Sequence, residues 1–366
     1  MNELLYSLKE ITKLRNIIRC AQLYYGLIPG YEGGMTQNEV ARQLNLTRNQ
    51  VVTLLQEMRE RGLLEVKLRV PRALEWEQHV IARYEKDYAL RDVRIVIDTS
   101  IPNENCSRSG SRKTSDKTSG IASTVQAVGE EAARYIRNVV PDGEVIGVGG
   151  GRTVLAMASF LPAGMFEWLR IFPLSAGGPI QITANSIVAT IAAKCANQDK
   201  TEAHGLYVPP LTIRSIDEST QEKKFYLSRR EIRGVYEAAH NVNVAFIGIG
   251  SLKTEAGRRR TAEYLFADDA LIADAIEQGA IGNILQQFFD ADGNIVKCQL
   301  SHRNLAVPLE HLKKIASEFP AKRVIALASG KDKCEAVRAA IKGRLFNVLI
   351  TDTTIAEFLL TESNRI

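Results

Sequence analysis

The 366-residue sequence lacks the features of metal-bound, disulfide-linked and membrane proteins. Its five cysteines are widely scattered, without the Cys-x-x-Cys pairs of a zinc ribbon or the spacing of a disulfide framework. No run approaches the roughly eighteen apolar residues that span a membrane. The first residues mix charged with apolar side chains, unlike a signal peptide. We therefore expect a cytoplasmic protein with no metal site and no membrane partner.

Residue patterns of common enzymes are also missing. The five histidines are dispersed, and neither Gly-x-Ser-x-Gly nor His-Glu-x-x-His occurs. The nucleotide-binding pattern GxxxxGK[ST] is absent as well. Asp268-Asp269 and Asp290/Asp292 are explained by a helix N-cap and an Asp-Gly turn rather than by acid–base chemistry. We therefore predict that the chain is not an enzyme and has neither catalytic residues nor a cofactor.

What the sequence does contain is typical of a globular protein of two domains. Hydrophobic residues make up 45% of the chain and charged residues 24%, and 366 residues exceed the usual length of one domain. The net charge is +5. Nearly all of the excess lies in residues 1–72, where 11 lysines and arginines face 7 acidic residues. This location suits a segment that meets phosphates.

Residues 36–64, TQNEVARQLNLTRNQVVTLLQEMRERGLL, have the pattern of a helix-turn-helix. Thr36 is a predicted N-cap, with Glu39 in capping-box position. A second helix is predicted from Thr47 to about Arg61, burying the set Val51, Leu54, Leu55 and Met58. An earlier helix over 4–25 is expected to bury Leu4, Leu8, Ile11, Leu14, Ile18 and Ala21. The segment LLEVKLRV (63–70) is a candidate wing.

The start of the second helix of a helix-turn-helix enters the major groove of DNA. Arginine can pair with guanine, and asparagine or glutamine with adenine, through two hydrogen bonds at once. The candidate DNA-binding residues are Thr36, Gln37, Thr47, Arg48, Asn49, Gln50 and Thr53. A protein-interaction module over residues 1–70 is the alternative for this segment.

From residue 72 onward, helical segments alternate with short apolar runs. This alternation predicts a mostly parallel sheet covered on both faces. Helices are expected over 72–90, 121–138, 152–161, 183–196, 228–240, 268–278, 308–318 and 332–342. Strands are expected over 93–98, 144–149, 169–177, 206–211, 244–251, 323–330 and 347–352, with a hairpin at 288–297. The polar segment 102–120 is predicted to be a surface loop.

Four of the predicted strands end in glycine-rich turns: GVGGGRT (147–153), SAGG (175–178), GIGS (248–251) and ASGKDK (328–333). Ligands of parallel sheets bind outside the carboxyl ends of the strands. Glycines let the backbone approach an anion, and helix N-termini direct N–H groups at it. Arg152, Thr153, Lys331 and Lys333 add charged or hydroxyl donors, so these turns indicate a ligand that carries a phosphate.

The whole chain resembles the SorC family, the sugar-binding, DeoR-related transcriptional regulators. The segments that carry the resemblance are the helix-turn-helix, VIGVGGGRTV, FIGIGS, GAIGNILQQFFDADGNIV and VIALASGKDKCEAVRAAIKGRLFNVLITD, which together cover about residues 15–360. The family commonly has Trp at position 150, Asp at 283 and Ser-Arg at 52–53, where this chain has Gly150, Asn283 and Val52-Thr53.

The resemblance implies a winged helix-turn-helix domain joined to a Rossmann-like, doubly wound α/β effector domain of the sugar-phosphate isomerase/deaminase type. It implies homodimers or homotetramers on operator DNA that respond to a phosphorylated sugar. The expected domains are residues 1–70 for DNA binding, 71–92 for a linker helix and 93–366 for effector binding and oligomerisation. The effector-binding residues would be Gly149, Gly150, Gly151, Arg152, Thr153, Gly177, Gly250, Ser251, Asn283 and Lys333. A sugar-phosphate isomerase or deaminase with an appended helical domain is the alternative.

Overall fold

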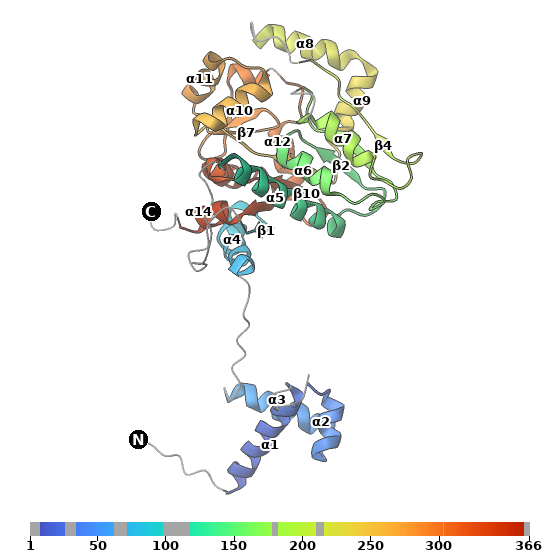
Figure 1. Cartoon of the computed structure of the whole chain (residues 1–366), viewed down its shortest axis with the longest axis vertical. Helices are drawn as coiled ribbons and strands as arrows, with labels where there is room; N and C mark the ends of the chain where they lie inside the picture. Colours follow the sequence, from blue (N-terminus) through green and yellow to red (C-terminus); the bar gives the residue numbers. More distant parts are fainter. Residues whose placement is uncertain are drawn as a thin grey trace. The chain divides into compact units, whose positions relative to one another are not determined.

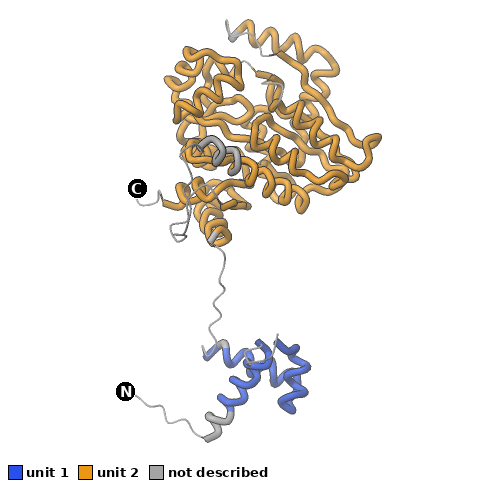
Figure 2. Tube along the Cα trace, viewed as in Figure 1, with its two compact units in different colours: residues 1–70 blue, residues 71–366 orange. Residues whose placement is uncertain are grey.

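The structure is a computed structural model that describes residues 8–25, 34–61, 72–97, 117–177, 182–209, 216–302 and 304–361. It contains two compact units, residues 1–70 and residues 71–366 (Figure 2). Three predicted segments fall outside the described residues: the candidate wing at 63–70, residues 4–7 of the predicted helix 4–25, and 102–116 of the polar loop.

Unit 1 (residues 1–70) contains three described helices, α1 (Leu8–Tyr24), α2 (Gln37–Leu44) and α3 (Arg48–Glu60) (Figure 1). The predicted capping box is confirmed, because the Thr36 N–H donates to Glu39 Oε2 at 2.7 Å and Thr36 Oγ1 accepts from the Glu39 N–H at 3.4 Å. The apolar spacing predicted for α3 is also confirmed. Its buried side chains pack with those of α1 and α2 in one core, formed by Ile17, Cys20, Ala21, Leu23, Val40, Ala41, Val51, Leu55 and Met58.

The buried face of α1 differs from the prediction. Ile17 is fully buried, whereas Ile18, which was expected to face the core, is 46% exposed. Ala21 is buried as predicted, but the other buried positions, Ile17 and Cys20, are each offset by one residue from the predicted stripe. The prediction failed because it counted the strongly apolar Ile18 and did not weigh Cys20, a residue that behaves as a small hydrophobe when buried.

Unit 2 (residues 71–366) is built on a seven-stranded, all-parallel sheet in the order β1-β11-β10-β5-β2-β3-β4. Its strands are β1 (Asp92–Val96), β2 (Val145–Val148), β3 (Arg170–Pro173), β4 (Glu202–Ala203), β5 (Val244–Gly248), β10 (Arg323–Leu327) and β11 (Val348–Asp352). Its helices are α4 (Arg72–Tyr88), α5 (Lys117–Val139), α6 (Arg152–Phe160), α7 (Ala184–Ala192), α8 (Ile216–Ser228), α9 (Arg230–Ala239), α10 (Glu255–Leu265), α11 (Asp269–Glu277), α12 (Leu309–Ser317), α13 (Cys334–Lys342) and α14 (Thr353–Thr361), with 3-10 turns η2 (Gln299–His302) and η3 (Lys331–Lys333).

Helices cover both faces of this sheet, as the alternating pattern predicted. Successive residues of β5 point to opposite sides, so that Phe246 packs with α5, α6 and α7 while Ala245 and Ile247 pack with α4, α9, α12, α13 and α14. Buried apolar strands with helices on both sides are the mark of a doubly wound α/β domain. In this topology the turns after β2, β5 and β10 share one edge of the sheet.

A second, four-stranded antiparallel sheet has the order β6-β7-β8-β9, with β6 (Gly250–Ser251), β7 (Gly282–Ile284), β8 (Gln287–Phe289) and β9 (Ile295–Val296). The predicted hairpin at 288–297 is confirmed by the pairing of β8 with β9. The structural explanations for the acidic pairs hold as well. Asp268 caps α11 by accepting the Leu271 N–H, and Asp290 Oδ1 accepts the N–H groups of Asp292 and Asn294.

Some predicted elements are wrong. Residues 206–209 of the predicted strand 206–211 are irregular, and the strand at this edge is β4, four residues earlier. The Asn185 side chain pairs there with both backbone groups of Leu206, at 2.8 and 3.1 Å, in place of a strand partner. Residues 117–120, assigned to the loop, begin α5, and the prediction missed α8, α10 and α14.

Candidate functional site

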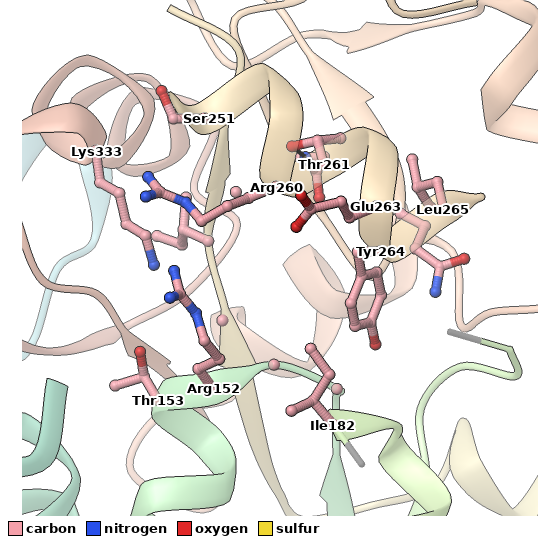
Figure 3. Close-up of a pocket in the computed structure, with 18 of the residues that line it drawn as sticks. Arg152, Thr153, Ile182, Ser251, Arg260, Thr261, Glu263, Tyr264, Leu265 and Lys333 are labelled. Carbon is pink, nitrogen blue, oxygen red and sulfur yellow. Dashed lines mark hydrogen bonds between the residues drawn. The ribbon is translucent and has the colours of Figure 1, made fainter. Parts of the chain in front are cut away.

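A cavity of about 480 Å³ lies at the carboxyl ends of β2, β5 and β10 (Figure 3). Its walls come from segments far apart in the sequence. They are the turn that enters α6, the β5–β6 turn, helix α10, the β7–β8 hairpin and the 3-10 turn η3. The cavity therefore lies at the edge of the sheet where ligands of parallel α/β sheets bind.

The turn after β2 brings backbone close to the cavity. The Gly149 N–H donates to Phe246 O at 2.8 Å, and the Gly151 N–H donates to Ile182 O at 2.9 Å, which fixes the turn between its neighbours. Gly151 has φ +129°, a conformation that favours glycine, and a Cβ atom at Gly150 would collide with the Tyr264 hydroxyl. Helix α6 starts directly after this turn with its N-terminus at the cavity.

Three cationic side chains converge at one end of the cavity. Figure 3 shows the Lys333 ammonium group and the guanidinium groups of Arg152 and Arg260 pointing toward one another. The pKa of Lys333 is lowered to about 8; burial is the main cause, Asp332 opposes it, and Arg152 and Arg260 contribute to the lowering. Burial also lowers the pKa of Arg152, with Arg260 as the next cause. Arg260 and Asp332 form an ion pair, so this end keeps a surplus of positive charge.

The other end of the cavity is largely neutral. Tyr264 lies there with Leu265, and Ile182 lies below it (Figure 3). Burial raises the pKa of Tyr264 to about 12, so its hydroxyl stays protonated at neutral pH. The neighbouring Gln286 side chain opposes this rise without coming into hydrogen-bond geometry. The two ends of the cavity therefore differ in charge.

The structure brings most of the predicted effector residues into this cavity. Those that line it are Gly150, Gly151, Arg152, Thr153, Gly250, Ser251, Asn283 and Lys333. Gly149 lies behind the wall, where a Cβ atom would be 2.8 Å from Leu285 Cδ2. Gly177 lies beside Asn304, outside the cavity.

Sequence reasoning missed the contribution of α10, which supplies Arg260, Thr261, Glu263 and Tyr264 to the cavity wall. The signal that could have located this helix was Thr254. Its side chain caps α10 by accepting the Gly257 N–H at 3.1 Å, and a helix-permitting run follows it. Asn283, which was predicted, is placed against this helix by a hydrogen bond from its Nδ2 to Thr261 Oγ1 at 3.5 Å.

In unit 1 the predicted DNA-contacting residues gather around the start of α3. Thr47, Arg48, Asn49 and Gln50 are exposed there, and Arg48 Nε donates to Gln37 Oε1 at 3.3 Å. Thr53 Oγ1 donates to Asn49 O at 3.0 Å. Thr47 and Gln50 form a second capping box, because the Thr47 N–H donates to Gln50 Oε1 at 2.8 Å and the Gln50 N–H donates to Thr47 Oγ1 at 3.3 Å.

This cap assigns different roles to neighbouring residues. Gln50 could contact an adenine through both of its side-chain atoms only by giving up the capping bond. Thr36 likewise serves as the cap of α2. Arg48 and Asn49 stand outside both capping boxes and remain the best-placed candidates for base contacts.

Comparisons with known proteins match nearly the whole chain. A family model described as "Putative sugar-binding domain" matches residues 74–361. The deoxyribonucleoside regulator of Bacillus subtilis (strain 168) is 25% identical over 345 residues, covering 94% of this chain and 97% of that protein. The sorbitol operon regulator of Klebsiella pneumoniae is 23% identical over 350 residues, covering 95% and 98%. The crystal structure of this full-length regulator, SorC, matches with a TM-score of 0.62 and 22% identity, covering 95% of this chain and 99% of that chain.

Proposed function

The chain belongs to this sugar-binding domain family, whose members include SorC, and on that premise we propose a transcriptional regulator controlled by a phosphorylated sugar. The helix-turn-helix of unit 1 binds operator DNA, and the cavity of unit 2 binds the effector. The relatives are named as the deoxyribonucleoside regulator and the sorbitol operon regulator. From this relationship we infer that the chain binds DNA and responds to a sugar.

The observation that carries the effector assignment is the convergence of Lys333, Arg152 and Arg260. Arg152 and Arg260 lower the pKa of Lys333, and Arg260 lowers that of Arg152, so these cations are held together at a cost that an anion among them removes. The N-terminus of α6 adds backbone N–H groups at the same end. A phosphate group fits this arrangement because it presents several oxygens to guanidinium and ammonium donors at once.

The cavity supports binding better than catalysis. The acidic side chains that line it are Glu263 and Asp332, and Asp332 is paired with Arg260. Among the described lining residues there is no histidine. Isomerisation of a sugar phosphate needs a group that takes a proton from carbon, and the remaining carboxylate, Glu263, is paired with Arg259 at 3.7 Å.

The alternative, a sugar-phosphate isomerase, has one observation in its favour. A lysine with a pKa of about 8 can act as a base near neutral pH. Incubation of the full chain with fructose 6-phosphate, glucosamine 6-phosphate and ribose 5-phosphate tests it by NMR. We expect all three to remain unchanged; turnover that depends on Lys333 would make the protein an enzyme.

We propose that the DNA-binding form is a dimer or tetramer on a roughly palindromic operator. Helix-turn-helix proteins of this kind read two half-sites with two copies of the motif. The effector then acts by favouring one arrangement of the copies, and its effect cannot exceed its difference in affinity between the two states. Light scattering of the free protein and of its DNA complex measures the number of copies.

The effector assignment is tested by thermal shift of the full chain with a panel of sugar phosphates. A ligand at a hundred times its Kd stabilises the folded state by about 2.7 kcal/mol, so binding raises the melting temperature. Lys333→Met should weaken binding roughly ten- to hundredfold, because a hydrogen bond to a charged group contributes about 1.5–3 kcal/mol. Lys331→Met is the matched control, since Lys331 is exposed on the same 3-10 turn outside the cavity. An equal loss in both variants would remove the assignment.

A further inference from the structure

Two adjacent glutamines in the β7–β8 hairpin have opposite hydrogen-bonding states. Gln287 is satisfied, because its Nε2 donates to Val307 O at 2.8 Å and its Oε1 accepts the Leu309 N–H at 3.1 Å. Gln286 is only 6% exposed and lines the cavity, yet its Nε2 atom makes no hydrogen bond in the described structure. A buried amide donor without a partner is costly unless something else supplies an acceptor.

The backbone holds Gln286 in an unfavourable conformation. Leu285 and Gln286 form the two-residue loop of the hairpin, with φ values of +48° and +65°. Glycine or asparagine normally occupies such positions, since side chains with more bulk are strained there. Leu285 is buried, and its contact with Gly149 fixes the turn against the β2 loop. Strained residues that are held in place in this way cluster at ligand-binding sites.

The surroundings of Gln286 indicate what it contacts. Tyr264 beside it is neutral, because burial raises its pKa to about 12, and Leu265 and Ile182 are apolar. Glu263, the lining residue of α10 next to Tyr264, is paired with Arg259, with 3.7 Å between Arg259 Nε and Glu263 Oε1. The three cations are at the other end (Figure 3). A second phosphate would meet no cation among the described lining residues at this end, because Arg259, the partner of Glu263, does not line the cavity.

We propose that Gln286 is a specificity-determining residue, which donates a hydrogen bond from Nε2 to an uncharged oxygen of a sugar that carries a single phosphate. The oxygen is a carbonyl, ring or hydroxyl oxygen at the end of the sugar away from its phosphate. The cavity discriminates against the corresponding bisphosphate, because its second phosphate reaches the neutral end. This inference rests on the proposed function, since it takes the cationic end as the site of the first phosphate.

The test is calorimetric titration of the full chain with inorganic phosphate and with matched sugar pairs. The pairs are fructose 6-phosphate with fructose 1,6-bisphosphate, glucose 6-phosphate with glucose 1,6-bisphosphate, and ribulose 5-phosphate with ribulose 1,5-bisphosphate. We expect at least one monophosphate to bind in a Lys333-dependent manner, and at least tenfold more tightly than its bisphosphate. Gln286→Met keeps the length of the side chain and removes the amide. It should weaken the binding of that monophosphate at least tenfold and change the affinity for inorganic phosphate by less than twofold.

Two further variants separate recognition from folding. Glycine adopts φ +65° without strain, so Gln286→Gly should keep the melting temperature of the ligand-free protein and lose the same sugar affinity. Gln287→Met should lower the melting temperature and leave the ratio of monophosphate to bisphosphate affinity unchanged. Equal monophosphate affinity in the wild type and Gln286→Met, or a bisphosphate that binds as tightly, would overturn the role of Gln286 alone. The lack of any Lys333-dependent ligand in the panel would instead overturn the proposed function, and this inference with it.

Discussion

The two units of the chain place their candidate contacts in different ways. In unit 1 the residues proposed to meet DNA lie within positions 36–53, on exposed ends of two short helices. In unit 2 the cavity joins residues from position 150 to position 333, and its walls belong to a sheet edge, a helix and a hairpin. A local site depends on one small core, whereas an assembled site depends on the topology of a whole domain. A substitution that destroys one of the two sites should therefore leave the other intact.

The largest expected effect comes from breaking the core of unit 1. Leu55 of α3 is 5% exposed and lies in the core that α3 forms with α1 and α2, and Leu→Ala in a core costs about 2–5 kcal/mol. A domain this small has little stability to lose. Leu55→Ala should abolish DNA binding while the melting-temperature shift caused by a sugar phosphate persists, as measured by calorimetry and gel shift.

Val52→Ala is the control on the same helix, because Val52 is 40% exposed. Its effect on the stability of unit 1 should stay within about 0.5 kcal/mol. If Leu55→Ala destroyed sugar-phosphate binding as well, the two units would not be separable.

Arg48→Ala should have the next largest effect, on DNA affinity alone. Loss of a two-bonded guanine contact costs about 1–3 kcal/mol and relaxes the sequence preference at that position. Arg42→Ala, on the exposed surface of α2, removes the same charge and is the control. Arg42→Ala should weaken binding to specific and to non-specific DNA equally. Gel shifts at a fixed salt concentration measure both; an unchanged ratio of specific to non-specific affinity in Arg48→Ala would contradict a base contact.

The smallest predicted effect is a pH dependence confined to unit 2. Lys333 has a pKa of about 8, so it loses its proton between pH 7 and pH 9 and attracts an anion less. The sugar phosphate is already doubly charged in this range, because its second pKa is about 6. Affinity for the effector should therefore fall about tenfold from pH 7 to pH 9. Titration calorimetry of Lys333→Met should show a flat profile, and a slope as steep as that of the wild type would assign the titration to another group.

The sequence was a good guide where side chains follow local rules. The capping box of Thr36, the buried spacing of α3 and the alternation of strands with helices are set by neighbours a few residues away. The grouping of the Gly150 and Lys333 turns followed from the parallel sheet, because the carboxyl ends of its strands share one edge.

What escaped prediction depends on tertiary contacts. Helix α10 has the sequence EAGRRRTAEYL, in which Gly257 and three consecutive arginines conceal the short buried stripe, so Arg260 and Tyr264 were not foreseen. The hairpin loop at Leu285-Gln286 could not be predicted for a different reason. Both residues have positive φ, a conformation that leucine and glutamine disfavour. Ile18 in unit 1 is a further example. Ile17 and Ile18 are equally hydrophobic, and tertiary packing buries Ile17 instead of the predicted Ile18.

The central claim is that ligand in the cavity of unit 2 controls DNA binding by unit 1. Fluorescence anisotropy with a genomic fragment that the protein protects measures this directly, with and without the sugar phosphate that raises the melting temperature. The sugar phosphate should change the DNA affinity of the wild type by at least about fivefold. It should leave that of Lys333→Met unchanged, and the two proteins should bind equally without ligand. An equal response in Lys333→Met, or no response in a wild type whose cavity is saturated, would contradict the claim.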